Sequence, residues 1–128
     1  MEMAQVKTVL VVDDTLVVLS LVAAIVESGN HIPLTASSYQ EALSISEQSI
    51  NLDVLITDIR MPGMNGFELA RIIRDTRPGL PILFISGDFD SEENEHLEWL
   101  QKPNVAFLPK PFSPSSLLEN LDAVLAPA

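Results

Sequence analysis

The chain has 128 residues and no cysteine, and 18 acidic against 7 basic side chains give it a net charge of −11. A chain of this length forms one domain, so we expect residues 1–128 to be a single domain. The missing cysteines exclude disulfides and thiolate metal sites, and the acidic balance argues against direct binding of nucleic acid. No apolar stretch has the length of a membrane helix and the N-terminus does not resemble a secretory signal, so a cytoplasmic protein is expected.

Short apolar runs alternate along the chain with segments of helical periodicity. The apolar runs predict strands at 8–12, 31–36, 54–57, 82–85 and 105–108. The periodic segments predict helices at 15–28, 38–48, 65–75, 91–100 and 115–125. Gly29 and Asn30 mark the end of the first helix, and Ser113 with Pro114 marks the start of the last.

Strands and helices that alternate in this way form a parallel sheet with helices on both faces. Pro33 cannot donate a hydrogen bond to a neighbouring strand, so the second strand belongs at an edge of the sheet. That position fits the strand order 2-1-3-4-5 of a doubly wound, flavodoxin-like α/β fold, in which the first and third strands are central neighbours. The carboxyl ends of all five strands then lie at one edge of the sheet, where such folds bind their ligands.

Polar side chains stand at the carboxyl ends of four of these strands: Asp13 and Asp14, Asp58, Ser86, and Lys110. Three carboxylates about 5 Å apart repel by roughly 3 kcal/mol per pair at an effective dielectric constant near 20, so an ionised cluster requires a cation. Oxygen ligands with room for water and a phosphate select Mg²⁺ (or Mn²⁺) over Zn²⁺. The pattern predicts a magnesium and phosphoryl site with Asp58, which projects alone from a central strand, as the attacking carboxylate.

Four motifs at these positions resemble those of one family. They are Val-Val-Asp-Asp, Asp-Ile-Arg-Met-Pro-Gly-Met-Asn-Gly, Ile-Ser-Gly and Lys-Pro-Phe, in this order along the chain. With them the chain resembles the receiver domains of two-component response regulators and hybrid histidine kinases, over residues 8–125. The resemblance implies a single receiver domain, here without an output domain, that works in a phosphorelay.

The resemblance also implies the partners and the type of activity. A histidine kinase or a histidine phosphotransfer protein would donate the phosphate, and a downstream output protein or domain would respond to the changed surface. Such a module catalyses its own phosphorylation and dephosphorylation but turns over no diffusing product. We therefore expect a signalling module and not an enzyme in the usual sense.

The family assigns a role to each residue around the expected metal. Asp58 would accept the phosphate, and Asp14 would bind Mg²⁺ directly. Asp13 would act mainly through a water molecule, and the backbone carbonyl of Arg60 would complete the protein ligands. Taken alone, Asp14 has a structural alternative, because aspartate at this place is also a common cap of a following helix.

Three further residues receive roles in sensing the phosphoryl group. Ser86 and Lys110 would contact it, although Ser86 taken alone is also a common turn residue before glycine. The resemblance implies a cis bond between Lys110 and Pro111, which X-Pro bonds tolerate at small cost. Phe107 would rotate between exposed and buried positions when phosphate binds; the alternative is an ordinary core aromatic.

The first helix carries more large apolar residues than one buried stripe needs. We expect the inner stripe to consist of Val18, Leu21, Val22 and Ile25. Leu16, Val17 and Leu19 lie outside that stripe, beside the edge with Asp58. Burial against the last helix would account for them; alternatively, Leu16 and Val17 form an apolar patch on which the helical bundle of a partner docks.

Two charged residues are expected at the mouth of the site. Arg60 and Asp88 lie two positions beyond Asp58 and Ser86, and a pair between them would shield an acyl phosphate from water. The alternative is that both side chains are solvated independently, as charged side chains on loops usually are.

Three other kinds of function remain as alternatives. A Mg²⁺-dependent aspartyl-phosphate phosphatase usually has its two Asp separated by one residue, whereas Asp13 and Asp14 are adjacent. A flavin-binding protein would need a hydroxyl-rich phosphate loop after the first strand. A receiver-like interaction module that works without phosphorylation would not need all five site residues.

Overall fold

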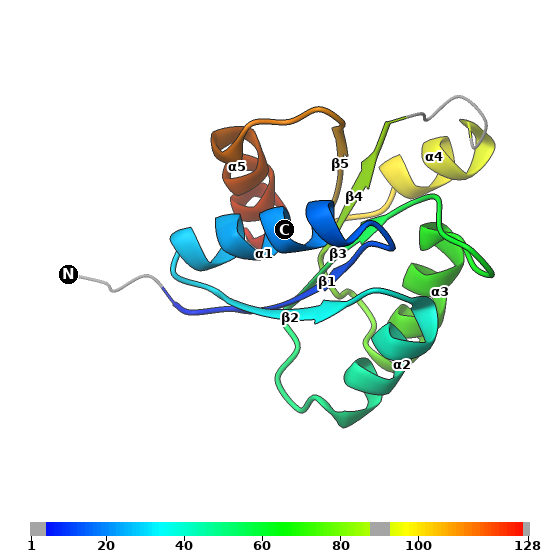
Figure 1. The fold of residues 1–128 in the computed structure, drawn as a ribbon. Helices are drawn as coiled ribbons and strands as arrows, with labels where there is room; N and C mark the ends of the chain where they lie inside the picture. Colours follow the sequence, from blue (N-terminus) through cyan, green and yellow to red (C-terminus); the bar gives the residue numbers. More distant parts are fainter. Residues whose placement is uncertain (1–4, 88–92, 127–128) are drawn as a thin grey trace.

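The computed structural model describes residues 5–87 and 93–126, in which five strands and five helices alternate (Figure 1). The strands are β1 (Thr8–Val12), β2 (Ile32–Ala36), β3 (Val54–Asp58), β4 (Ile82–Ser86) and β5 (Val105–Pro109). The helices are α1 (Leu16–Ser28), α2 (Tyr39–Gln48), α3 (Gly66–Thr76), α4 (Glu93–Leu100) and α5 (Pro114–Leu125). The expected elements are all confirmed, with ends that differ by one or two residues. For α4, the two residues before Glu93 lie outside the described part.

The strands form one parallel sheet in the order β2-β1-β3-β4-β5, which confirms the doubly wound, flavodoxin-like arrangement. Pro33 lies on β2, an edge strand, as its missing N–H requires. In the register of the sheet, Val12 pairs with Thr57 and Ser86 pairs with Pro109. The strands therefore end level with one another, and the residues after them meet at one edge.

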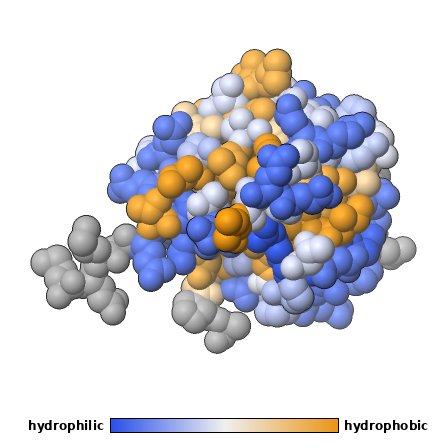
Figure 2. All heavy atoms as spheres, turned by 90° about the horizontal axis from the view of Figure 1, so that it is seen from below, coloured by the Kyte–Doolittle hydropathy of each residue, from blue (hydrophilic) through white to orange (hydrophobic). Residues whose placement is uncertain are grey.

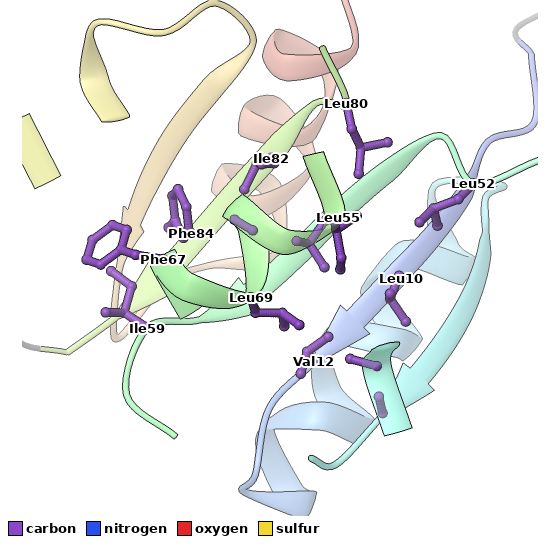
Figure 3. Packing of buried hydrophobic residues seen from close by; sticks show 14 of the residues in the cluster. Leu10, Val12, Leu52, Leu55, Ile59, Phe67, Leu69, Leu80, Ile82 and Phe84 are labelled. Atoms are coloured by element: carbon purple, nitrogen blue, oxygen red, sulfur yellow. The ribbon is translucent and has the colours of Figure 1, made fainter. Parts of the chain in front are cut away.

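Two apolar layers cover the sheet because successive strand side chains point to opposite faces. On β1, Val9 and Val11 pack in the layer with α1 and α5, while Leu10 and Val12 pack in the layer with α2 and α3. Figure 3 shows the second layer, in which Leu10 and the aromatic ring of Phe67 lie among other buried side chains. Both faces of the central strands are covered by apolar layers, which explains why the sequences of β1, β3 and β4 are mainly apolar.

Side-chain caps fix where several helices begin. Asn65 and Ser113 each form a capping box at the start of α3 and α5, and Pro114 occupies the first turn of α5 as expected. At α2, the Ser38 hydroxyl accepts a hydrogen bond from the Glu41 N–H at 3.2 Å. At α1 the N-cap is Thr15, without a side-chain cap, so the capping alternative for Asp14 is wrong.

The buried stripe of α1 differs from the expected one. The buried residues are Leu19, Val22, Ile25 and Val26, and Leu21 is 48% exposed. The helix packs against both the sheet and α5, so its buried side is centred on Val22 and includes residues three before and four after it. Leu19, expected outside the stripe, is therefore part of the core.

The surface is mixed in character. Figure 2 shows the molecule from below the view of Figure 1, which is the side of α2. On this face several hydrophobic patches are separated by hydrophilic residues. Such a mixture is usual for folded domains, in which much of the surface is apolar. Among the described residues, no helix combines the length and the apolar character needed to cross a membrane.

Candidate functional site

Three carboxylates meet at the carboxyl edge of the sheet. Asp13 and Asp14 follow β1, Asp58 ends β3, and one oxygen from each lies within 4.8 Å of the others. Asp13 and Asp58 are buried, whereas Asp14 is exposed. The donor set fits a hard divalent cation, since it offers three carboxylate oxygens and is open to solvent on the side of Asp14. The sequence prediction that these residues lie together is therefore confirmed as geometry.

The turn between β1 and α1 holds Asp13 in place. The Thr15 N–H donates to Asp13 Oδ1 at 2.9 Å, and the Asp13 N–H donates to the carbonyl of Ala36 at 3.2 Å. Because Oδ1 already accepts a backbone hydrogen bond, Oδ2 is the atom that faces the site. This leaves Asp14, which is exposed, as the carboxylate with more freedom to adjust to an ion.

Lys110 brings a positive charge to the two buried carboxylates. Its Nζ atom lies 3.4 Å from Asp13 Oδ2 and 3.5 Å from Asp58 Oδ2. The Lys110 N–H donates to the carbonyl of Ser86 at 2.9 Å, which ties the β5–α5 loop to the end of β4. The bond between Lys110 and Pro111 is cis, as expected.

Ser86 ends β4 and is only 1% exposed. Its neighbour Ile85 pairs with Asp58 in the register of β3 and β4, so Ser86 lies one residue beyond Asp58 along the same edge. The structure thus brings Ser86 to the edge with the carboxylates and Lys110. Its role as a hydroxyl donor to a phosphoryl group stays a prediction.

Burial and neighbouring negative charges both affect the pKa of Asp58. Burial raises the pKa of Asp58 above its ordinary value, and the carboxylate of Asp13 raises it further. The Lys110 ammonium and a hydrogen bond from the Ile59 N–H act in the opposite direction, and Asp14 adds a smaller upward contribution to the pKa. The upward effects prevail, so without a cation Asp58 keeps its proton to a higher pH than an ordinary aspartate does.

Phe107 lies half-buried on β5, within a group of aromatic rings. Its ring centroid is 5.0 Å from that of Phe84, 6.2 Å from that of Phe67 and 4.1 Å from that of His96. The ring packs partly buried against the core layer with α2 and α3, and its role as a switch stays a prediction. The contact with His96 on α4 was missed from the sequence, because nothing in the acidic segment around His96 indicates which face of α4 meets β5.

The structure describes only some of the residues that were predicted at the rim of the site. Leu16 and Val17 at the start of α1 are 66% and 79% exposed, so burial against the last helix does not account for them. Arg60 is exposed on the loop after β3. Asp88, its expected partner in a gate, lies outside the described residues, so the gate stays a prediction.

A cavity beside Asp14 was also missed from the sequence. It has a volume of about 290 Å³ and lies between the loop after β2 and the loop after β3. Tyr39, Met61 and Gly63 contribute to its wall together with Asp14. Tyr39 gave no sequence signal, since a single aromatic residue at the start of a helix is compatible with many surroundings.

Comparisons with known proteins agree with this geometry. Residues 9–122 match the response regulator receiver domain family. The chain is 36% identical over 110 residues to the two-component response regulator ARR21 of Arabidopsis thaliana, covering 85% of this chain and 17% of that protein. It is 30% identical to the phosphate regulon transcriptional regulatory protein PhoB of Pseudomonas aeruginosa, covering 93% of this chain and 52% of PhoB. The chain thus spans about half or less of the length of these two relatives.

Solved structures show the same likeness over whole domains. The chemotaxis protein CheY4 of Vibrio cholerae superposes with a TM-score of 0.84 at 29% identity, covering 94% of this chain and all 100% of CheY4. The receiver domain of the hybrid histidine kinase CckA superposes with a TM-score of 0.77 at 30% identity, covering 94% and 100% of the two chains.

Proposed function

Because this chain belongs to the response regulator receiver domain family, we propose that it is a phosphoacceptor in a two-component phosphorelay. In this proposal a histidine kinase or histidine phosphotransfer protein donates its phosphoryl group to Asp58. The observation that carries the proposal is the meeting of the Asp13, Asp14 and Asp58 carboxylates with the ammonium of Lys110 at one edge of the sheet.

Receiver domains bind Mg²⁺ through an acidic pocket, and the cluster found here fits that ion. We assign the protein ligands to Asp13, Asp14 and Asp58 together with the backbone carbonyl of Arg60. When bound, the ion would supply positive charge to the oxygens of the transferred phosphoryl group. The same charge would favour the ionised form of Asp58, whose pKa is raised in its absence.

The transfer itself requires only positioning and charge from the protein. A carboxylate oxygen of Asp58 attacks phosphorus in line, and a P–O bond forms as the P–N bond to the donor histidine breaks. The electron pair of that bond returns to the imidazole nitrogen. Lys110, already within 3.5 Å of the Asp58 carboxylate, would pair with a phosphoryl oxygen, and Ser86 would donate its hydroxyl to another.

The output would come from a change of packing. Phe107 lies half-buried between Phe84 and His96, and we propose that movement of Ser86 toward the phosphoryl group changes its position. Since phenylalanine has no hydroxyl, the change would be read through the shape of the β5 surface by a downstream protein or domain. The chain would act as a signalling module with no turnover of a diffusing product.

The exposed start of α1 is proposed as the docking surface for the phosphate donor. Leu16 and Val17 directly follow the loop that carries Asp13 and Asp14, and both are largely exposed. An apolar surface at this place would let a helical partner bury it while its phosphohistidine approaches Asp58.

The proposal is tested by mass spectrometry of the intact protein after incubation with acetyl phosphate and Mg²⁺. The wild type should gain one phosphoryl group, and the gain should be absent with EDTA and in Asp58→Asn. A parallel assay with a phosphomonoester should show no turnover, which separates this function from a phosphatase. No gain in the wild type, or an equal gain in Asp58→Asn, would overturn the proposal.

A further inference from the structure

The loop between β3 and α3 connects Asp58 to the first helical residue, Gly66, and carries Arg60. Its far end is firmly anchored, because the Gly66 N–H donates to the carbonyl of Ile59 at 2.7 Å. A Cβ atom on Gly66 would lie 2.3 Å from the carbonyl oxygen of Asp58, so only glycine allows this approach. The two ends of the loop are thereby held together, and its middle must be held by something else.

The middle of the loop depends on side-chain packing. Within the described part of the chain, residues 61–64 make no hydrogen bond. Instead the ring of Tyr39 presses against Gly63, where an added Cβ would lie 2.7 Å from Tyr39 Cε1. Gly63 has a φ of 84°, which favours glycine as well. The loop therefore turns tightly against an aromatic ring from another element.

Tyr39 is itself held in a fixed position. It is the first residue of α2, directly after the cap Ser38, and its ring packs at the border of the core layer that contains Ala42. Among the described residues, its hydroxyl group forms no hydrogen bond, so the ring rather than the hydroxyl makes the contact. On the open side, Tyr39 and Gly63 line the cavity of about 290 Å³ that also reaches Asp14. Removing the ring would take away this contact of Gly63, while Met61 and Met64 on either side would still pack against the core layer.

We propose that Tyr39 is a positioning residue for the metal site. Its ring holds Gly63 in place and thereby fixes the position of the Arg60 backbone carbonyl in the same loop. The inference rests on the proposed function, since it concerns the affinity for Mg²⁺. A carbonyl oxygen carries no full charge, so it contributes to metal binding only when the backbone already presents it at the required place. Residues that orient metal ligands without touching the ion typically change affinity by about 10- to 100-fold when removed.

The test measures Mg²⁺ affinity directly by isothermal titration calorimetry, without any phosphorylation assay. Tyr39→Ala should raise the dissociation constant for Mg²⁺ by roughly tenfold. Tyr39→Phe should leave it at the wild-type value, because the ring is kept and only the unbonded hydroxyl is lost. Circular dichroism and urea unfolding in EDTA establish that each variant is folded before it is titrated.

A second variant keeps the inference testable if Tyr39→Ala does not fold. Gly63→Ala should also weaken Mg²⁺ binding, because its methyl group would overlap Tyr39 Cε1. In the double variant with Tyr39→Ala the space of the ring is free, so the loss of affinity should be smaller than the sum of the two single losses. If Tyr39→Ala does not fold, Tyr39→Leu takes its place in this comparison. Equal affinity of Tyr39→Ala and wild type, or fully additive losses in the double variant, would overturn the inference. A wild type that binds no Mg²⁺ would instead contradict the proposed function.

Discussion

The Asp58 carboxyl lies almost entirely out of solvent, and the Asp13 carboxylate beside it carries the same charge. Burial and this neighbour raise the pKa of Asp58, and the ammonium of Lys110 compensates for them only in part. The folded, metal-free protein therefore binds a proton at Asp58 more readily than the unfolded chain does. The ionised carboxylate that the proposed function requires therefore lowers the stability of the metal-free folded state, as charged groups at ligand sites commonly do.

This conflict predicts a pH-dependent gain in stability for Asp58→Asn in EDTA. Above the raised pKa, the ionised Asp58 destabilises the folded state, whereas below its unfolded pKa it is protonated in both states. At neutral pH the variant should thus be more stable than the wild type, and the difference should shrink as the pH falls toward and below the unfolded pKa of the carboxyl. Urea unfolding of both proteins across this pH range measures it. A variant that is less stable at neutral pH would contradict this account of the site.

At the scale of elements, hydrophobic periodicity predicts that α1 is a helix but does not predict which of its faces is buried. Its extent and its C-terminal end at Gly29 followed from the sequence, but its N-cap, Thr15, did not. Nearly every position is apolar, so several buried stripes were equally compatible with the sequence. Contact with both the sheet and α5 decides that Leu19 is buried and Leu21 exposed. Leu16 and Val17 lie outside both the expected stripe with Leu21 and the observed stripe with Leu19. Their interpretation as a docking surface therefore does not depend on which of the two stripes is buried.

The proposed docking surface predicts a difference between two phosphate donors. Replacing Leu16 and Val17 by Ser should slow phosphotransfer from a phosphorylated histidine phosphotransfer protein about tenfold or more, because apolar area in the interface is lost. Phosphorylation by acetyl phosphate, which needs no docking, should keep its rate. The control is Leu21→Ser, one change of the same kind at an exposed position of the same helix. Equal slowing with both donors would contradict docking at this surface.

At the scale of the whole molecule, the fold and the convergence of the three carboxylates were predictable from the sequence. The alternation of elements fixes a parallel sheet, and Pro33 on the edge strand helps to fix its order. The contacts of Tyr39 with Gly63 and of Phe107 with His96 were not predictable, because each joins residues on separate elements and neither pair forms a local pattern. Sequence patterns locate strand ends well, whereas packing between loops emerges only when the chain is folded.

The carboxylate cluster also predicts how Mg²⁺ affects the stability of the whole domain. An ion that binds only the folded state stabilises it by about 2.7 kcal/mol at a free concentration near 100 times its dissociation constant. Thermal unfolding of the wild type with Mg²⁺ should therefore occur at higher temperature than with EDTA. In Asp14→Asn, which removes an exposed carboxylate of the cluster, most of this shift should be lost. A shift of equal size in both proteins would mean that the ion acts elsewhere.

The central claim is that Asp58, rather than Asp13 or Asp14, receives the phosphoryl group. It is tested most directly by treating the phosphorylated protein with sodium borohydride, which reduces an aspartyl phosphate to homoserine, and by sequencing the peptides with mass spectrometry. The account predicts homoserine at position 58 only, and only after incubation with Mg²⁺ and acetyl phosphate. Homoserine at position 13 or 14, or unmodified aspartate at position 58 in a protein that has gained a phosphoryl group, would contradict it.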